Sequence, residues 1–181
     1  MFVIFSGVSG AGKQTIMDAV MEDYANSEVV KSATTREKRE GEDIHYYMTH
    51  KEFQAGIKKE EFFEYENVHG FMYGILNKDL KHVIDHPEIM FFKDVDVHGT
   101  EKLVKYLKGK TKVVTIFLDC PDEILHDRLL KRGESEERVK VRLQRGAMER
   151  PYKDKYDFAI DNIVLDETIA KVKEFILKAQ N

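Results

Sequence analysis

The chain has 181 residues, of which 42% are hydrophobic and 34% are charged, a composition typical of a folded globular protein and not of a disordered one. Its formal net charge is −4, with 29 basic and 33 acidic residues, which argues against a general nucleic-acid-binding protein because such proteins usually carry a basic excess. Cys120 is the single cysteine, and we see neither a signal peptide nor a run of about 18 apolar residues, so we expect a cytoplasmic protein without internal disulfides or membrane contact.

The first elements along the chain alternate between strand and helix. Residues 2–5 form a short apolar run that ends at glycines, which predicts a buried parallel strand. Residues 15–24 predict a helix, because Ile16, Ala19, Val20 and Tyr24 fall on one of its sides. A second short strand starts at residues 29–30, and the polar, glycine-broken residues 34–45 predict a loop.

The rest of the chain continues this alternation. Strands are predicted at residues 62–65 and 71–73, around a turn at Gly70, and at residues 90–95, 113–118 and 156–160. Helices are predicted at residues 52–59, from Pro121 to Arg132, and at residues 134–149. In the last helix a core-facing stripe consists of Leu165, Ile169, Val172, Ile176 and Ala179.

Strands that alternate with helices predict an α/β fold with a parallel sheet covered by helices on both faces. No repeat or linker divides the chain, so residues 1–181 are expected to form a single domain. Two stretches interrupt the rhythm, near residues 32–75 and 132–149. We interpret them as candidates for mobile pieces over a site at the strand ends.

The sequence "GVSGAGKQT" follows the first predicted strand and nearly matches the phosphate-binding pattern G-x-x-x-x-G-K-[ST]. Its glycines let the backbone curl so that successive N–H groups point at phosphate oxygens, and its lysine adds a positive charge. A strand before the loop and a helix after it favour a nucleotide site over a chance glycine-rich turn. The candidate ATP-binding residues are Gly7, Val8, Ser9, Gly10, Ala11, Gly12, Lys13, Gln14 and Thr15.

Gln14 stands where this pattern places a hydroxyl for magnesium. A hydroxyl follows at Thr15, and Mg²⁺ keeps several waters and takes ligands from the phosphates of its substrate. We therefore interpret the loop as competent, with Mg²⁺ arriving on ATP and with Thr15 or Asp94 as its possible protein ligands. The amide of Gln14 could itself donate to a phosphate.

Further polar groups follow predicted strands. Arg36 and Arg39 lie three residues apart in "SATTREKREGE", and two guanidinium groups suit a phosphate. Asp94 and Asp96 end an apolar strand, as carboxylates that face a metal or a base would. Lys93 stands inside the same apolar strand, and the sequence assigns it no role.

Taken in order, these stretches resemble the guanylate kinase family: "SGVSGAGKQT", "SATTREKREGE", "EFFEY…GFMYG", "KDVDVHG" and "RLLKRGESEERVKVRL". The resemblance implies a P-loop kinase fold that transfers the γ-phosphoryl group of ATP to GMP, giving ADP and GDP, with Mg²⁺ as cofactor. It also implies a core (residues 1–31, 76–131 and 150–181), an NMP-binding part (residues 32–75) and a lid (residues 132–149). A monomer or a homodimer is expected, with no nucleic-acid partner.

The resemblance also implies roles for particular residues. Arg36 and Arg39 would clamp the GMP phosphate together with the phenol of Tyr73, and Glu64 would accept hydrogen bonds from the guanine N1–H and amino group. The chemistry agrees, because adenine cannot imitate these two adjacent donors. Residues with further implied roles are Ser32 and Asp96 in reading the base, and Lys13, Arg132 and Arg142 at the ATP phosphates.

Two departures from the family pattern leave the acceptor open. The tyrosine that touches the GMP phosphate in the family aligns with His45, or with Tyr46 if the gap shifts. Ile75 replaces a Ser or Thr that helps to read guanine, and losing such a hydrogen bond costs about 1–3 kcal/mol. Two alternatives remain beside guanylate kinase. These departures motivate a kinase of another phosphorylated small molecule, and Gln14 alone supports a catalytically silent module that binds a phosphorylated protein segment.

Overall fold

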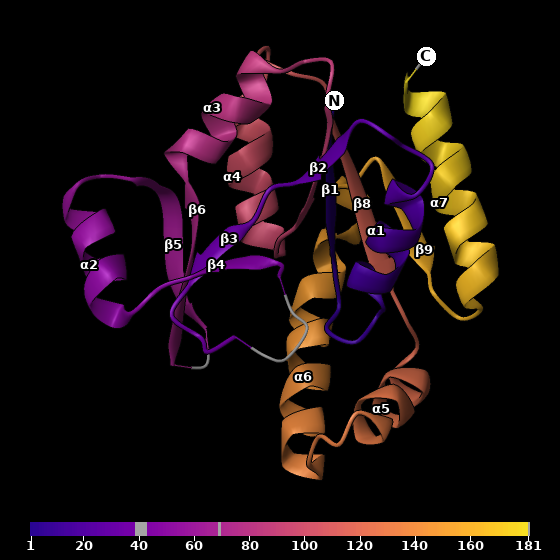
Figure 1. The fold of residues 1–181 in the computed structure, drawn as a ribbon. Coiled ribbons are helices and arrows are strands. Elements are labelled where there is room, and N and C mark those ends of the chain that lie inside the picture. Colours follow the sequence, from indigo (N-terminus) through magenta and orange to yellow (C-terminus); the bar gives the residue numbers. More distant parts are fainter. Residues whose placement is uncertain (39–42, 69, 181) are drawn as a thin grey trace.

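The protein is described by a computed structural model that covers residues 1–38, 43–68 and 70–180. Its central feature is a five-stranded parallel sheet in the order β2-β7-β1-β8-β9, visible in Figure 1. The strands are β1 (Phe2–Gly7), β2 (Ser27–Val29), β7 (Met90–Asp94), β8 (Val113–Asp119) and β9 (Phe158–Asp161). The predicted parallel sheet is confirmed.

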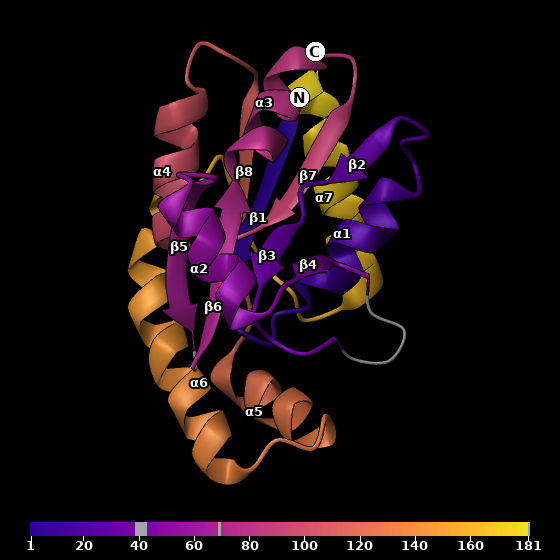
Figure 2. The ribbon, with the colours of Figure 1, turned by 60° about the vertical axis from the view of Figure 1, so that its left-hand side comes forward.

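Helices cover both faces of this sheet (Figure 2) because the side chains of β1 alternate between them. Val3 and Phe5 lie in a core cluster with residues of α1 (Lys13–Met21) and α7 (Leu165–Gln180). Phe2 and Ile4 lie in a second cluster with residues of α3 (Asn77–Asp85) and α4 (Val97–Leu107). Every residue of β1 is buried, as the apolar run predicts for a strand covered on both sides.

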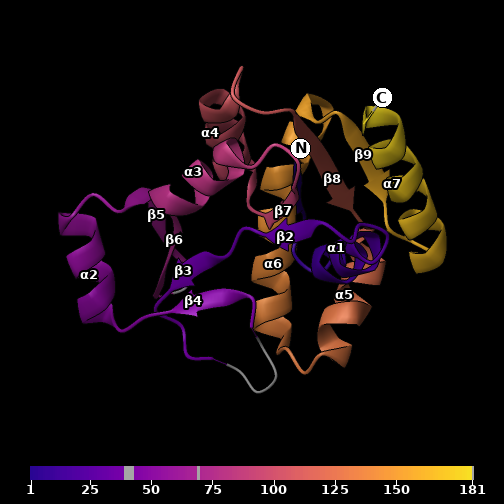
Figure 3. The same cartoon turned by 45° about the horizontal axis from the view of Figure 1, so that its top comes forward.

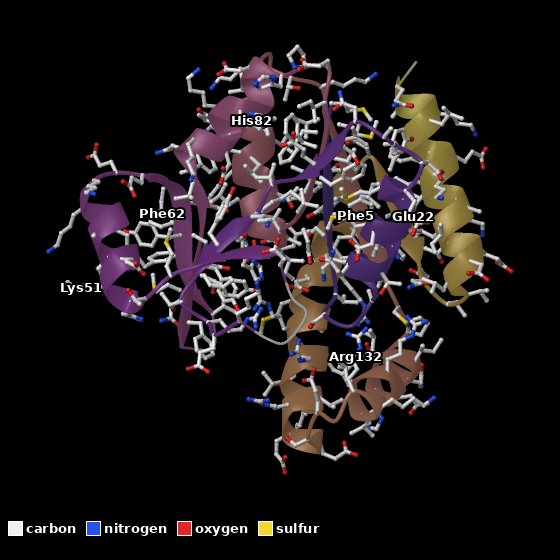
Figure 4. The ribbon with its side chains drawn as sticks, viewed as in Figure 1. Phe5, Glu22, Lys51, Phe62, His82 and Arg132 are labelled. Atoms are coloured by element: carbon white, nitrogen blue, oxygen red, sulfur yellow. The ribbon has the colours of Figure 1, made fainter. Side chains whose placement is uncertain are left out.

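A second, four-stranded sheet lies beside the first (Figure 3) in the order β4-β3-β6-β5. It consists of β3 (Ser32–Thr34), β4 (His45–Tyr47), β5 (Phe62–Val68) and β6 (Phe71–Leu76). Helix α2 (His50–Lys58) covers its outer face, where the rings of Phe53 and Phe62 stack with centroids 4.3 Å apart. Figure 4 labels Phe62 between α2 and this sheet.

Two helices lie beyond the carboxyl ends of the core strands: α5 (Asp122–Lys131) and α6 (Glu136–Glu149), which continues into the 3₁₀ helix η1 (Arg150–Lys155). Strand β1 pairs with β7 on one side and with β8 on the other. Strand β1 therefore lies where the order of the strands in the sheet reverses. In such sheets ligands bind in the crevice outside the carboxyl ends of the strands.

Several sequence predictions need correction. Residues 34–45 are not all loop, because the strand β3 ends within this stretch and the strand β4 begins within it. Each strand has three residues, which are too few to produce a periodic signal in the sequence. The sequence reading missed helix α4. Its buried residues step by three and four, but Gly99 and Thr100 disfavour a helix. Leu165 is 38% exposed and does not belong to the core stripe, because it occupies the first position of α7.

Other predictions are confirmed with shifted ends. The first helix ends at Met21 and buries Ile16, Met17 and Val20. Cys120 is buried, and this burial raises the pKa of its thiol. Among the described residues, no helix combines the length and the apolar character needed to cross a bilayer.

Candidate functional site

A cleft of about 400 Å³ opens where the two sheets and α6 face each other. It is bordered by the carboxyl ends of β1 and β7, by β5 and β6 of the small sheet, and by the inner face of α6. The structure brings ten of the predicted site residues to its walls: Gly7, Ser9, Lys13, Ser32, His45, Glu64, Tyr73, Asp94, Asp96 and Arg142.

The glycine-rich loop between β1 and α1 forms one end of the cleft. Gly7 has φ 122°, and a Cβ there would lie 1.9 Å from the Leu118 carbonyl oxygen, so only glycine fits. The Lys13 ammonium donates to the carbonyl oxygens of Gly7 at 2.9 Å and Val8 at 3.3 Å, and so lies across the loop. Because α1 begins at Lys13, its first backbone N–H groups lack partners within the helix and favour an anion.

Three residues in or near this loop were predicted to matter for magnesium binding: Gln14, Thr15 and Asp94. The Gln14 amide donates to the Asp18 carboxylate at 2.6 Å along α1, and Thr15 is exposed. Asp94 is an exposed carboxylate at the end of β7 and lines the cleft with Lys13. Within the described residues, no three His, Cys, Asp or Glu side chains form a metal-binding cluster. Asp94 and Thr15 thus stay the candidates for a single protein ligand to a magnesium ion that keeps phosphate and water ligands.

The small sheet supplies the opposite wall. The Glu64 carboxylate is 16% exposed and pairs with the Lys102 ammonium at 2.9 Å. Such a carboxylate can accept two hydrogen bonds from a ligand that carries adjacent donors. His45 and Tyr73 also line this wall, with their rings edge to face and centroids 5.8 Å apart.

Helix α6 reaches across to the glycine-rich loop. The Arg142 guanidinium donates from Nη1 to the Ser9 hydroxyl and from Nε to the Glu134 carboxylate, the latter at 2.6 Å. Arg142 therefore holds a positive charge beside the N-terminal end of α1. A polyphosphate bound on the loop would meet both Lys13 and this guanidinium.

Comparisons with known proteins agree with this geometry. The guanylate kinase family model matches residues 1–179. A guanylate kinase of Rickettsia felis is 33% identical over 182 residues, which covers 98% of this chain and 93% of that protein. A guanylate kinase of Helicobacter pylori is 34% identical over 180 residues, with coverage of 97% and 84%. The chain belongs to the guanylate kinase family.

A solved structure supports the same conclusion for the fold. The guanylate kinase of Anaplasma phagocytophilum superimposes with a TM-score of 0.74 at 27% identity, covering 99% of this chain and 85% of that one. As a member of the guanylate kinase family, the chain is a nucleotide-binding transferase with an α/β fold. The resemblance seen in the sequence is thereby confirmed.

Not every predicted site residue of this guanylate kinase family member lines the cleft. The Arg36 guanidinium donates to the Glu37 carbonyl oxygen at 3.0 Å and lies over the Tyr47 ring at 5.8 Å. Arg132 is exposed at the turn between α5 and α6 (Figure 4). Arg39 lies outside the described residues.

The structure places His45 and Tyr46 differently. His45 lines the cleft, whereas the Tyr46 hydroxyl donates to the Asp79 carboxylate of α3 at 3.3 Å. Successive side chains of a strand point to opposite faces, so only one of these neighbours can face the cleft. Burial and the Asp79 carboxylate raise the pKa of the Tyr46 phenol.

Sequence reasoning missed a group of charged residues in the cleft. Arg145 lies 3.6 Å from the Asp96 carboxylate and 3.0 Å from the Glu149 carboxylate. Burial raises the pKa of Glu149, and burial followed by the nearby Asp96 raises the pKa of Glu66. The sequence spacing could have identified this group. Residues 142, 145 and 149 lie three and four positions apart, so they share one face of α6.

Asp96 and Gly99 also shape the cleft through structural contacts. Asp96 caps α4 by accepting a hydrogen bond from the Gly99 N–H at 2.8 Å. A Cβ on Gly99 would lie 2.7 Å from a Glu64 carboxylate oxygen, so the glycine leaves room for Glu64. The buried Asn162 donates to the Ala11 carbonyl oxygen of the glycine-rich loop at 2.8 Å.

Proposed function

We propose that this protein transfers the γ-phosphoryl group of ATP to GMP, giving ADP and GDP. The observation that carries the proposal is a single cleft that holds the Lys13 ammonium at one end and the Glu64 carboxylate on the facing sheet. One end suits a polyphosphate, and the other suits a base with adjacent hydrogen-bond donors. The two nucleotides would therefore meet within one cavity.

Glu64 is the proposed reader of guanine. Its carboxylate would exchange part of its pairing with Lys102 for hydrogen bonds from the guanine N1–H and amino group. Adenine presents an acceptor at N1, which a carboxylate repels. Ser32 and Asp96 line the same cleft and are the further candidates for base contacts.

The transfer needs positioning and charge neutralisation rather than a general base, because the GMP phosphate is already an anion. Lys13 and Arg142 would hold the β and γ phosphates of ATP while the acceptor phosphate lies in line. When bound with ATP, Mg²⁺ would supply further neutralisation of the phosphates, and Asp94, which lines the cleft, is the proposed carboxylate to hold it. No covalent intermediate on the protein is required.

The division into core, NMP-binding part (residues 32–75) and lid (residues 132–149) belongs to this proposal. The small sheet would carry GMP, with His45, Tyr73, Arg36 and Arg39 at its phosphate. Arg132, exposed in the present arrangement, would reach the ATP phosphates only when the lid closes. Closure would also exclude water and suppress ATP hydrolysis. A cytoplasmic location remains a prediction.

The decisive experiment is an ADP-release assay with Mg-ATP and, separately, GMP, dGMP, AMP, UMP and CMP. We expect turnover with the guanine nucleotides and none above background with the others. Turnover with another acceptor, or with none of the five, would contradict the proposal. In the last case Gln14→Ser would be the first variant to assay, since it restores the usual hydroxyl.

Replacing Lys13 by Ala is expected to lower kcat by about 10²–10³-fold, the effect of removing one preorganised charge from a transition state. The fold should persist, because α1 stays anchored by Ile16, Met17 and Val20. Steady-state kinetics and a thermal melt measure the two quantities. Lys178→Ala, which removes an exposed ion pair with Glu174, is the matched control and should keep full activity.

A further inference from the structure

Lys93 is a buried charged residue that the proposed mechanism leaves without a role. It belongs to β7, follows the buried Phe91 and Phe92, and is only 3% exposed. Its ammonium donates to the Ser32 hydroxyl oxygen at 2.5 Å. This hydrogen bond joins the core sheet to β3 of the small sheet at the wall of the cleft.

The direction of this hydrogen bond fixes what Ser32 can do. A lysine ammonium can only donate, so the Ser32 oxygen is the acceptor and its own proton points elsewhere. Among the residues that the structure describes, none accepts a hydrogen bond from the Ser32 hydroxyl. Because Ser32 lines the cleft, this hydroxyl is left to donate to a ligand there.

The register of the small sheet places Ser32 in line with Glu64. Glu64 pairs with Ile75 across β5 and β6, and Ala33 pairs with Gly74 across β3 and β6. The antiparallel ladder therefore sets Ser32 beside Ile75, so that Glu64, Ile75 and Ser32 form one row across three strands. All three line the cleft, and Ile75 offers no hydrogen bond.

The hydrogen-bonding edge of guanine matches this row. Its two donors, the amino group and N1–H, lie next to one acceptor, the oxygen on C6. With Glu64 accepting from the donors, the Ser32 hydroxyl is the donor left for that oxygen. A 6-amino group in the same place would give the Ser32 proton no acceptor, although the hydroxyl oxygen keeps a second lone pair.

We infer that Lys93 is a positioning residue that holds the Ser32 hydroxyl as a donor to the C6 oxygen of guanine. The inference rests on the proposed function and adds a residue that compensates for Ile75. Lys93 itself does not touch the ligand, because it lies behind Ser32.

The charges around Lys93 support this role. Burial lowers the pKa of its ammonium to about 8, while the carboxylates of Asp94, Asp79 and Glu64 act in the opposite direction. These carboxylates come from β7, α3 and β5, and so approach from three elements. Negative charge from three elements thus faces the ammonium that donates to Ser32.

The test compares the binding of GMP with that of 6-thioguanosine monophosphate, which differs only by sulfur in place of the C6 oxygen and accepts hydrogen bonds weakly. Dissociation constants are measured by calorimetry at pH 7. We expect the wild type to bind GMP about tenfold more tightly. Lys93→Met should weaken GMP binding by about tenfold and binding of the thio analogue by less than about twofold.

Matched variants separate positioning from stability. Ser32→Ala should lose the preference for GMP over the thio analogue to the same extent as Lys93→Met. The double variant should lose no more of this preference than either single variant. Lys173→Met, which removes an ion pair with Asp23 outside the cleft, should keep the preference. If Lys93→Met does not fold, Lys93→Gln replaces it, because its shorter side chain keeps a polar group but cannot reach Ser32.

The outcomes distinguish the inference from the proposed function. If Lys93→Met weakens the binding of both ligands equally, the role of Lys93 is purely structural and the inference is overturned. An unchanged preference for GMP over the thio analogue would overturn it as well. A wild type that binds neither nucleotide would overturn the proposed function and the inference with it. A wild-type preference for GMP that survives in Lys93→Met would overturn the inference alone.

Discussion

Two lysines of the cleft region differ in what surrounds their ammonium groups. Lys13 lines the cleft and donates to two carbonyl oxygens of the glycine-rich loop, where an entering phosphate can replace them. Lys93 is buried in β7, and its Ser32 contact keeps it on the far side of the cleft wall. The same ammonium group is therefore available to a ligand phosphate at Lys13, whereas at Lys93 it orients the Ser32 hydroxyl.

The buried ammonium of Lys93 predicts a pH dependence of stability. Its pKa is about 8 in the folded protein and about 10.4 when exposed, so between these values the unfolded chain binds more protons. Stability from this group must then rise with pH. Relative to Lys93→Met, the free energy of unfolding of the wild type should increase by about 2 kcal/mol from pH 7.5 to 9.5.

Chemical denaturation of both proteins at several pH values measures this difference. Other titrating groups are common to the two proteins and cancel in the comparison. A difference that stays constant, or that falls with rising pH, would show that Lys93 keeps an ordinary pKa. The wild-type curve alone does not decide the question, because other groups also titrate in this range.

At the scale of elements, α2 shows how local chemistry supports the small sheet. Thr49 and Glu52 form a capping box at its start: the Thr49 hydroxyl accepts from the Glu52 N–H at 3.2 Å, and Glu52 accepts from the Thr49 N–H at 2.7 Å. Phe53 follows immediately and stacks on Phe62 of β5. The cap therefore fixes where the helix begins and aims its aromatic residue at the sheet.

Thr49→Ala is expected to lower the free energy of unfolding by about 1 kcal/mol, because it leaves the Glu52 N–H in the first turn of α2 without its partner. For a chain of this size this corresponds to a drop of about 2–4 °C in Tm. A thermal melt measures it. Thr49→Ser keeps the hydroxyl and serves as control; an equal drop in that variant would assign the loss to the missing methyl group instead.

At the scale of the whole molecule, the cleft exists only because three separate units meet. The core sheet contributes the glycine-rich loop and Asp94, the small sheet contributes Glu64, and α6 contributes Arg142 and Arg145. The contacts of α6 with Ser9 and Asp96 join it to the core across the opening. A ligand that reaches from the loop to the small sheet should therefore hold all three units together.

A compound that joins adenosine and guanosine through a polyphosphate chain is predicted to stabilise the protein more than ATP or GMP alone. At a hundredfold excess over its Kd the gain is about 2.7 kcal/mol, or roughly 5–10 °C in Tm. Differential scanning calorimetry measures the shift. The matching diadenosine compound is the control. If it raises the Tm by the same amount, the proposal that Glu64 recognises guanine is contradicted.

The sequence by itself determined the local parts of this protein. The glycines and Lys13 of the loop, the apolar strands on either side of it and most helices follow from residue type and spacing, since these depend on neighbours in the chain. The same holds for the family, because the ordered motifs extend from the loop to the helix that carries Arg142. Short strands such as β3 and β4 escaped because three residues carry no period.

Only the tertiary structure decided which of these parts face each other. His45 rather than Tyr46 lines the cleft, Arg145 and Glu149 join it from α6, and Lys93 meets Ser32 from another sheet. Ser32 and Lys93 lie 61 positions apart in the chain, so no local pattern could pair them. The physical reason is that burial, cross-strand register and charge pairing depend on distances through space, which a linear order of residues does not contain.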